Sequence, residues 1–396
     1  MRRMDRRHCV NTALLDRLRT ELEGRPPRHD LVVSGAQGPT LSLDGETLVN
    51  LASNDYLGLA GSPEVLAAAR EAMRDQGLGV AAGRVLCGTR SVHSALETAI
   101  AELVGTEDAV LYGSCFDANL GVFAALLGPD DVIFSDALNH ASLIDGIRLS
   151  QAQRRVYAHS DLNELERYLT ESTEARHRLI VTDGVFSMDG DLAALPRLAE
   201  LARRYDAVLL VDDSHATGVL GGGTAEHFGL VGEVDLVTGT LGKALGGAAG
   251  GFVAGPRAVT ETLRQVSRPY VFTNAMAPPL AAAALTAIRL AIHRPELRER
   301  LAANASWLRS ALRDLGYEVL PGEHPIVPVM LRGGTLAVDM AAALRREGVL
   351  VFALSHPVVP AGEERIRVQV SASHTREHLE QAAAAFGRVR GLLAAA

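Results

Sequence analysis

The sequence lacks paired cysteines, long apolar runs and an excess of positive charge, and each absence excludes a class of protein. Its three cysteines, Cys9, Cys87 and Cys115, are odd in number and scattered, so they predict no disulfide framework and favour a reducing cytoplasm. No apolar run approaches the length of a membrane span. The net charge of −8, from 39 basic and 47 acidic residues, gives no reason to expect nucleic acid or a membrane as partner.

The chain is long enough to bury a large core. Its 396 residues, 47% of them hydrophobic, have room for two domains of a soluble globular enzyme. The basic start at residues 1–7 leads into no apolar signal core. A mitochondrial presequence stays open, although Asp5 counts against it, and Met4 is an alternative start.

Lys243 is the most informative residue for function. It lies in the run 239–247 (GTLGKALGG), shortly after residues 211–215 (VDDSH). A lysine among small residues can form a Schiff base with a carbonyl if its amine is neutral and open. An aspartate at the end of an apolar strand, here Asp212, can pair with the pyridinium nitrogen of a cofactor. Together these roles predict a pyridoxal phosphate (PLP) enzyme, in which the ring accepts electrons and the protein tunes it.

Two other kinds of site are open to the same residues. A nucleotide-binding loop needs Ser or Thr directly after its Gly-Lys pair, but Ala244 follows here. Asp212, Asp213 and His215 could be metal ligands, although one imidazole and two carboxylates at one strand end rarely close a site alone. We therefore expect no metal.

The first part of the chain predicts a helix and a hairpin. Leucines at helical spacing predict a helix over residues 14–22, which cannot bury its apolar stripe alone and is expected to pack on another subunit. Asp44-Gly45 predicts a hairpin turn between two apolar stretches. Ser62-Pro63 then begins a helix that ends at Gly77.

Alternating strands and helices predict an α/β fold for the middle of the chain. The expected strands are residues 109–112, 132–135, 179–182, 208–211, 236–238 and 252–254. Such alternation calls for a mostly parallel sheet with helices on both faces, and ligands then collect at the carboxyl ends of the strands.

The C-terminal part predicts a smaller α+β domain. Strands are expected at 326–331, 350–353 and 365–370, with helices at 337–346 and 376–393. We therefore divide the chain into an N-terminal helix and hairpin arm (1–55), a large PLP-binding domain (56–290) and a small domain (291–396).

Further motifs follow the predicted strand ends. Residues 114–116 (SCF) open a helix whose backbone N–H groups could hold a phosphate, and Thr240 lies within reach of the same group. His140 stands at the next loop, although a lone histidine is more often a helix cap or a surface residue. Residues 186–191 (FSMDGD) form an unusual string that points to a specific role.

From about Leu51 to the C-terminal helix, the sequence resembles the α-oxoamine synthase family of fold-type-I PLP enzymes. The most specific motifs are residues 183–190 (DGVFSMDG), 211–215 (VDDSH) and 238–243 (TGTLGK). Within the family it is most similar to the acetyltransferases that use glycine, on residues 86–89, 114–119, 135–142, 267–270, 357–360 and 365–367.

The resemblance implies a role in PLP binding for each matching residue. Lys243 holds PLP and shuttles the substrate Cα proton, Asp212 pairs with the pyridinium nitrogen, and His215 hydrogen-bonds the phenolic oxygen. His140 stacks on the ring and helps to orient the substrate. The phosphate side is formed by Ser114, Cys115, Phe116 and Thr240, with Ser187 near the ring or the phosphate.

The resemblance also implies how substrates and a second subunit are bound. Asn54 and Arg367 bind the amino acid carboxylate, Arg367 by a bidentate fork. Thr273 and Asn274 reach a phosphate in the neighbouring subunit, which implies an obligate homodimer. The implied reaction condenses glycine with acetyl-coenzyme A to 2-amino-3-oxobutyrate and free coenzyme A.

Some departures leave the acyl group and the amino acid open. Residues 54–56 (NDY) resemble the 8-amino-7-oxononanoate synthases at least as well, Ala82 stands where a small polar residue is expected, and Ser355-His356 stands where an aromatic is usual. Such a synthase, or a secondary-metabolic relative with another acyl-coenzyme A or amino acid, is the alternative. A PLP-binding scaffold protein without activity is a further alternative. The presence of the full set of expected catalytic residues argues against it: Lys243, Asp212, His215 and Arg367.

Overall fold

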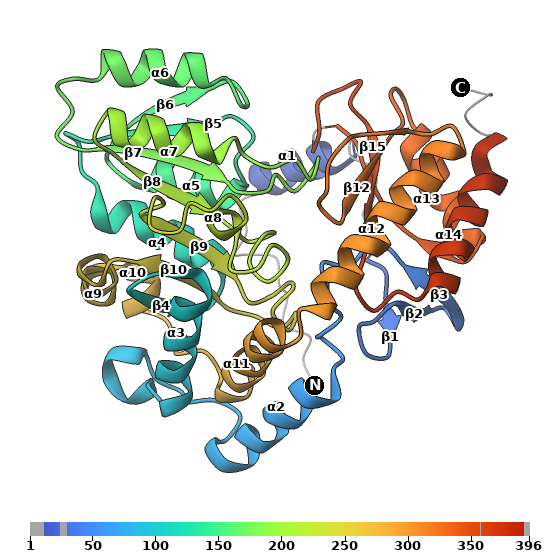
Figure 1. Cartoon of the computed structure of the whole chain (residues 1–396), viewed down its shortest axis with the longest axis horizontal. Coiled ribbons are helices and arrows are strands. Elements are labelled where there is room, and N and C mark those ends of the chain that lie inside the picture. Colours follow the sequence, from blue (N-terminus) through green and yellow to red (C-terminus); the bar gives the residue numbers. More distant parts are fainter. Residues whose placement is uncertain (1–11, 24–29, 357, 392–396) are drawn as a thin grey trace.

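The computed structural model describes residues 12–23, 30–356 and 358–391. The basic start, Cys9 and Pro357 lie outside these residues. In Figure 1 a large sheet with its helices occupies one side, and the C-terminal strands and helices occupy the other. Helices α11 (Pro278–His293) and α12 (Glu296–Asp314) lead from the first part to the second.

A seven-stranded sheet, in the order β4-β10-β9-β8-β7-β5-β6, forms the centre of the larger part. Strand β10 (Gly251–Gly255) runs antiparallel to both of its neighbours, and the other pairs are parallel. The prediction of a mostly parallel sheet is therefore confirmed. Its remaining strands are β4 (Asp108–Tyr112), β5 (Val132–Asp136), β6 (Gln153–Tyr157), β7 (Arg178–Asp183), β8 (Ala207–Asp212) and β9 (Leu236–Thr240).

Both faces of this sheet are buried. Leu209 and Val211 of β8 pack into one hydrophobic cluster and Leu210 packs into another, because successive strand residues point to opposite faces. Edge strand β6 was not predicted, since its residues QRRVY are mostly exposed and polar. The helical segments of this part are α2 (Pro63–Gln76), η1 (Arg84–Gly88), α3 (Ser91–Val104), α4 (Cys115–Leu126), α5 (Ala141–Leu149), α6 (Leu162–Glu171), α7 (Leu195–Arg204), α8 (Thr224–His227), α9 (Arg257–Val266) and α10 (Arg268–Val271).

The C-terminal part contains an antiparallel sheet in the order β11-β12-β15-β14. The strands are β11 (Glu318–Val319), β12 (Ile326–Met330), β14 (Phe352–Leu354) and β15 (Arg365–Gln369), and the helices are α12, α13 (Leu336–Arg346) and α14 (Arg376–Val389). The prediction of a single strand at residues 350–353 is wrong. It is two strands in different sheets, with Val351 between them and no turn residue to mark the break.

The N-terminal hairpin is joined to the C-terminal part. Strands β1 (Val33–Ser34), β2 (Thr40–Leu43) and β3 (Glu46–Asn50) form a sheet that β13 (Val349–Leu350) completes in parallel. The predicted turn is present, with positive φ at Asp44 (54°) and Gly45 (87°), as a two-residue hairpin loop requires. The division of the chain at residues 55 and 290 stays a prediction.

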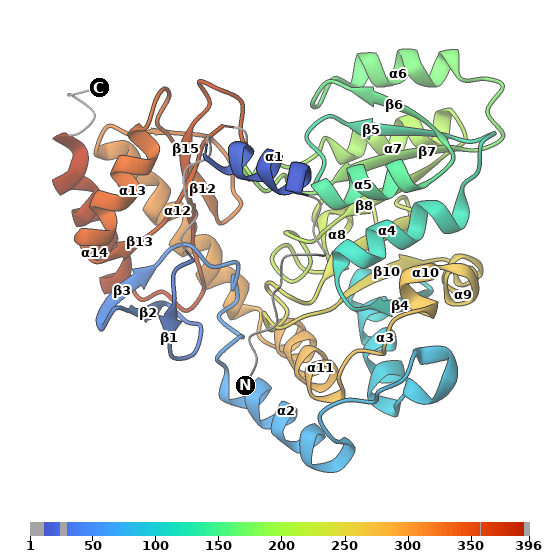
Figure 2. The same cartoon turned by 180° about the vertical axis from the view of Figure 1, so that it is seen from behind.

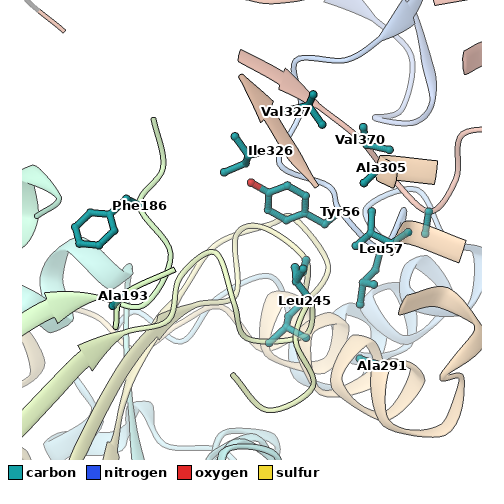
Figure 3. Close-up of a cluster of buried hydrophobic side chains, with 14 of the residues drawn as sticks. Tyr56, Leu57, Phe186, Ala193, Leu245, Ala291, Ala305, Ile326, Val327 and Val370 are labelled. Atoms are coloured by element: carbon teal, nitrogen blue, oxygen red, sulfur yellow. The ribbon is translucent and has the colours of Figure 1, made fainter. Parts of the chain in front are cut away.

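One hydrophobic cluster connects all these parts. Figure 3 shows Tyr56 from the segment after β3, Leu245 from the loop after β9, and Ile326 from β12 close together, and all three are buried. Movement of the segment after β3 would therefore disturb the loop that carries Lys243.

Helix α1 (Thr12–Glu23) forms as predicted but contains no buried residue. Leu18 is 40% exposed and Leu22 is 65% exposed, so its apolar stripe faces outward in the single chain. Figure 2 shows this helix, in blue, in front of the molecule, between the C-terminal part and α5. No helix in the described part of the chain is both long and apolar enough to cross a membrane.

Candidate active site

A cavity of about 210 Å³ opens where the central parallel strands end. Asp183, Asp212 and Thr240 are the last residues of β7, β8 and β9, and all three line it. The lining residues are Ser114, Cys115, Phe116, His140, Ser142, Asp183, Val185, Ser187, Asp212, Ser214, His215, Thr240 and Lys243. The structure thus brings together every residue predicted for the ring and the phosphate within one chain. Asn54, Arg367, Thr273 and Asn274 lie outside this lining.

Asp212 is a buried carboxylate, 3% exposed, held by two N–H donors. Asn119 Nδ2 donates to its Oδ2 at 2.6 Å, and the backbone N–H of Ser214 donates to its Oδ1 at 2.9 Å. Hydrogen bonds to the charged form stabilise a carboxylate away from water. The Asp212 carboxylate is therefore positioned to bind a cationic group in the cavity, such as a pyridinium nitrogen.

His140 both caps helix α5 and lines the cavity, so the two interpretations of this residue are compatible. Its Nδ1 lies 2.7 Å from Ser142 Oγ, and its backbone N–H donates to Asp183 Oδ2 at 2.9 Å. Asn119 Nδ2 also donates to Ser142 Oγ at 2.9 Å, which links His140 to Asp212. Burial lowers the pKa of His140, so the ring is neutral at physiological pH.

Lys243 and His215 form the reactive side of the cavity. Lys243 Nζ lies 2.9 Å from His215 Nε2, and the Tyr56 hydroxyl lies 2.8 Å from His215 Nδ1. Burial lowers the pKa of Lys243, although Asp212 opposes this shift. Burial and the neighbouring lysine lower the pKa of His215 well below its ordinary value. The amine therefore loses its proton more readily than a surface lysine, as a nucleophile requires.

The start of helix α4 and Thr240 form the other end of the cavity. The first N–H groups of a helix have no partner within it and attract anions. Ser114 is the N-cap, and its Oγ accepts from the backbone N–H of Asp117 at 3.1 Å. Strand β10 passes so close that a Cβ at Gly251 would lie 2.2 Å from the backbone nitrogen of Cys115, so only glycine fits there.

Two further aspartates near the cavity, Asp183 and Asp213, have raised pKa values. Burial and the charge of Asp212 raise the pKa of Asp183 well above its ordinary value. Burial raises the pKa of Asp213 to about 7, and this side chain is occupied by Thr224, which donates from its backbone N–H and its Oγ1 at 2.8 Å each. Within the described residues, no group of His, Cys, Asp and Glu side chains is arranged to hold a metal ion.

The two predicted carboxylate-binding residues lie directly behind the cavity wall. Arg367 Nη1 donates to the Ser187 carbonyl oxygen at 3.0 Å, and Ser187 lines the cavity. Tyr56, which contacts His215, also lies 3.4 Å from Asn54 Oδ1. With the Gln369 amide turned to suit its neighbours, its nitrogen donates to Asn54 Oδ1 and its oxygen accepts from Arg367. Asn54 and Arg367 are therefore part of one network.

Thr273 and Asn274 lie apart from this cavity. They line a separate small hollow beside Arg84 and Tyr270, and Thr273 Oγ1 donates to the Pro269 carbonyl oxygen at 2.5 Å. The structure does not bring them to the cavity of their own chain. A role for them at a phosphate requires a second subunit.

Several contacts were not assigned from the sequence. The sequence patterns indicate no role for Asn119, Ser142, Asp183 and Ser214, and Tyr56 stands in them only as part of the motif at residues 54–56. One signal was available for Asn119: it is a polar residue one helical turn after Cys115 in an otherwise largely apolar helix, and it is fully buried. For Tyr56 the sequence offers no comparable signal.

The residues present fit PLP, which carries an aldehyde, a pyridine nitrogen and a phosphate. A partly buried amine with a lowered pKa, Lys243, is placed for the aldehyde. A buried carboxylate, Asp212, is placed for the nitrogen, and the α4 N-terminus with the Ser114 and Thr240 hydroxyls is placed for the phosphate. Each group of the cofactor has a chemically matched partner in one cavity.

The sequence matches the family model for aminotransferase class I and II over residues 46–386. The chain belongs to this family. It is 47% identical to the 2-amino-3-ketobutyrate coenzyme A ligase of Escherichia coli (strain K12) over 372 residues, which cover 93% of this chain and 94% of that protein. It is 44% identical to an 8-amino-7-oxononanoate synthase of Exiguobacterium sibiricum over 381 residues, which cover 94% and 97%.

A solved structure supports the same assignment. Serine palmitoyltransferase with a PLP internal aldimine superposes with a TM-score of 0.90 at 31% identity, covering 98% of each chain. These relatives confirm that the chain is an α-oxoamine synthase with the fold of type-I PLP transferases. The predicted roles of single residues stay predictions.

Proposed function

We propose that the chain is a PLP-dependent acyltransferase that condenses glycine with acetyl-coenzyme A, giving 2-amino-3-oxobutyrate and coenzyme A. The observation that carries this proposal is the pair of Lys243 and Asp212 facing one cavity. The supporting comparison is the 47% identity to 2-amino-3-ketobutyrate coenzyme A ligase over nearly the whole chain.

PLP, when bound, supplies an electron sink that stabilises negative charge at the α-carbon of an amino acid. Lys243 does the proton transfer: its neutral Nζ accepts the α-proton of glycine, the acetyl group takes the place of that proton on the α-carbon, and the proton leaves with the coenzyme A thiolate as free thiol. Asp212 keeps the ring nitrogen protonated, because an opposite charge within hydrogen-bond reach favours the cation. Asn119 and Ser214 hold the Asp212 carboxylate in place for this task.

The remaining residues bind and orient. Arg367 and Asn54 bind the glycine carboxylate, Arg367 through the fork of its guanidinium. His140, neutral and held by Ser142, would pack on the ring of bound PLP, and His215 would bind its phenolic oxygen. The N–H groups that open helix α4 bind the phosphate.

A second candidate function is 8-amino-7-oxononanoate synthesis, in which a longer acyl group and alanine replace acetyl and glycine. The specific observation in its favour is the relative of that name at 44% identity, close to the 47% of the first. The same lysine and aspartate serve both reactions, so the two differ in the acyl and amino acid pockets. One methylene in an apolar pocket is worth about 1–3 kcal/mol, so preference among chain lengths is graded.

Thiol release measured for a matrix of substrates tests the proposal. Acetyl-, propionyl-, malonyl- and pimeloyl-coenzyme A are each offered with glycine, alanine and serine, and Lys243→Ala serves as the inactive control. We expect the highest kcat/KM for acetyl-coenzyme A with glycine. A lead for pimeloyl-coenzyme A with alanine would transfer the function to the second candidate, and no release with any pair would favour the inactive scaffold.

The active unit is a homodimer in this proposal. Thr273 and Asn274 lie away from their own cavity, beside a surface on which Leu86 is 80% exposed and Phe272 is 73% exposed. The outward stripe of α1 adds to the apolar surface that a second subunit would bury. Contact with a second subunit would place both residues at the partner's phosphate.

Mixed dimers test this arrangement. Lys243→Ala subunits and Thr273→Ala/Asn274→Ala subunits are each expected to be weakly active or inactive alone. If the two residues act across the interface, a mixed dimer contains one complete site and recovers up to half of the wild-type activity. If they act within their own chain, mixing restores nothing.

Cytoplasmic location is part of the proposal. The thiols of Cys87 and Cys115 are free, the first exposed and the second buried, and free exposed thiols persist in reducing compartments.

A further inference from the structure

Tyr56 is a fully buried tyrosine that contacts the reactive pair through His215. It follows strand β3 and lies in the cluster that joins the three parts of the chain (Figure 3). Its hydroxyl lies 2.8 Å from His215 Nδ1 and 3.4 Å from Asn54 Oδ1. His324 fixes the same histidine from behind, with its Nε2 2.9 Å from the His215 carbonyl oxygen.

The contact between Tyr56 and His215 is compatible with either tautomer, and the surrounding groups favour one of them. Burial raises the pKa of Tyr56, so its hydroxyl keeps its single proton. The hydroxyl can donate to Asn54 Oδ1, which also accepts from the turned Gln369 amide, or to His215 Nδ1, and the contact with His215 is the shorter one. With the hydroxyl donating along this shorter contact, Nδ1 is the acceptor, and a neutral His215 then carries its own proton on Nε2.

This tautomer acts on Lys243. Nε2–H points at Lys243 Nζ from 2.9 Å, and it can form a hydrogen bond there only with the lone pair of a neutral amine. An ammonium at that position would face a second donor. The opposite tautomer would present a lone pair to Lys243 and would stabilise the ammonium instead.

Other charged and titratable groups also act on this pair. Three acidic groups favour the charged Lys243 amine: Asp212, Asp183 and Cys115. The Arg367 guanidinium disfavours it. Two imidazoles, those of His140 and His324, lie near His215. All of them remain when only the Tyr56 hydroxyl is removed. A change seen on that removal therefore reports the tautomer.

We propose that Tyr56 is a positioning residue that fixes His215 as the Nε2–H tautomer and thereby keeps the Lys243 amine neutral for capture of PLP. The same tautomer makes His215 a donor toward the phenolic oxygen of the bound ring. The inference rests on the proposed PLP chemistry at Lys243, and it is independent of which acyl group and amino acid the enzyme uses.

The first test reads the tautomer directly in the wild-type protein without cofactor. Protein with ¹⁵N-labelled histidine is measured by long-range ¹H–¹⁵N correlation, and a His215→Asn variant identifies the His215 signals. We expect an unprotonated Nδ1 and a protonated Nε2. A protonated Nδ1, in the opposite tautomer or an imidazolium, overturns the proposal.

The second test measures the rate at which cofactor-free protein bonds PLP, as a function of pH, with borohydride reduction to locate the bond on Lys243. Tyr56→Phe keeps the buried ring and loses the hydroxyl. The control is Tyr317→Phe, which loses a hydroxyl that donates to the Phe386 carbonyl oxygen at 2.8 Å in the C-terminal part. We expect the midpoint of the rate against pH to rise by about one pH unit or more in Tyr56→Phe, so that capture at pH 7 slows about tenfold. The midpoint of the control should be that of the wild type.

The outcomes separate this inference from the proposed function. A wild-type profile in Tyr56→Phe overturns the role of Tyr56 while the PLP chemistry stands. Failure of the wild-type protein to bond PLP at Lys243 overturns the proposed function, and the tautomer measurement then still decides the claim about Tyr56 and His215.

Discussion

Asn119 donates a hydrogen bond of 2.6 Å to the Oδ2 of Asp212, from a helix that lies 93 residues earlier in the chain. The same amide donates to Ser142, whose hydroxyl contacts His140. One amide therefore positions two groups expected to bind PLP: the Asp212 carboxylate directly, and the His140 imidazole through Ser142. Changes in Asn119 should therefore alter both.

Asn119→Ala should lower kcat while PLP still binds. The variant removes a charge-assisted hydrogen bond worth roughly 1.5–3 kcal/mol, so about a ten- to hundredfold loss is expected. Steady-state kinetics with saturating PLP measures it, and exposed Asn163, replaced by Ala, is the control. An unchanged kcat would show that Ser214 and the Cys115 thiol orient the carboxylate without Asn119.

Asp212→Asn should bind PLP but lose catalysis. A neutral amide no longer keeps the ring nitrogen protonated, and we expect a rate loss of roughly a hundredfold or more, about 2.7 kcal/mol of transition-state stabilisation. The measurement is glycine α-proton exchange in deuterated water, which needs no acyl-coenzyme A. A near-wild-type exchange rate would mean that another group holds the nitrogen.

Arg367 and Arg365 should respond differently to replacement by Ala. Arg365 is ion-paired with Asp189 and its side chain is 5% exposed, so Arg365→Ala should chiefly lower the melting temperature. Arg367→Ala should raise the KM for glycine by about ten- to a hundredfold, because it loses a charge-assisted bond to the carboxylate. If Arg365→Ala raises the glycine KM and Arg367→Ala does not, the assignment is reversed.

His159 should give the protein a pH-dependent part of its stability. Its Nδ1 lies 3.0 Å from Asp136 and its Nε2 lies 3.1 Å from Asp191, and hydrogen bonds to these carboxylates raise its pKa to about 10. Because the folded pKa is above the ordinary value of about 6.5, this stabilisation is complete below about pH 6.5 and is lost as pH rises through about 10.

The test compares the free energy of unfolding of His159→Gln and wild-type protein in urea at pH 6, 8 and 10. We expect the free energy of unfolding of the wild type to exceed that of His159→Gln by about 1.5–3 kcal/mol at pH 6 and by much less at pH 10. A difference that does not vary with pH would show that the imidazole acts through packing on Phe186, whose ring lies 4.4 Å away.

The sequence located the cavity because parallel strands end at a common edge of the sheet. Motifs that follow β5, β7, β8 and β9 meet there however far apart they lie in the chain. The apolar runs of the buried strands were equally readable. Polar edge strand β6 was not, since an edge strand does not need apolar residues on both faces.

The partners of the site residues could not be read in the same way. Tyr56 reaches His215 across 159 positions of sequence, and Asn119 reaches Asp212 across 93. Such contacts depend on how α4 and the segment after β3 pack, which no local pattern encodes. The split of residues 349–354 into two strands was missed for the same reason, because both pairings are with distant segments.

The parallel pairing of β3 with β13 has a consequence for the order in which the protein matures. Val49 pairs with Val349 and Asn50 with Leu350, so the partner of β3 leaves the ribosome after every strand of the central sheet. Contacts between such distant segments form late in folding. Tyr56 lies six residues after the end of β3 and its ring packs edge-on against His324, so the contact of its hydroxyl with His215 depends on the C-terminal part. If Tyr56 sets His215 as proposed, the reactive lysine is set only after the C-terminal strands are in place, and cofactor capture becomes a mark of completed synthesis.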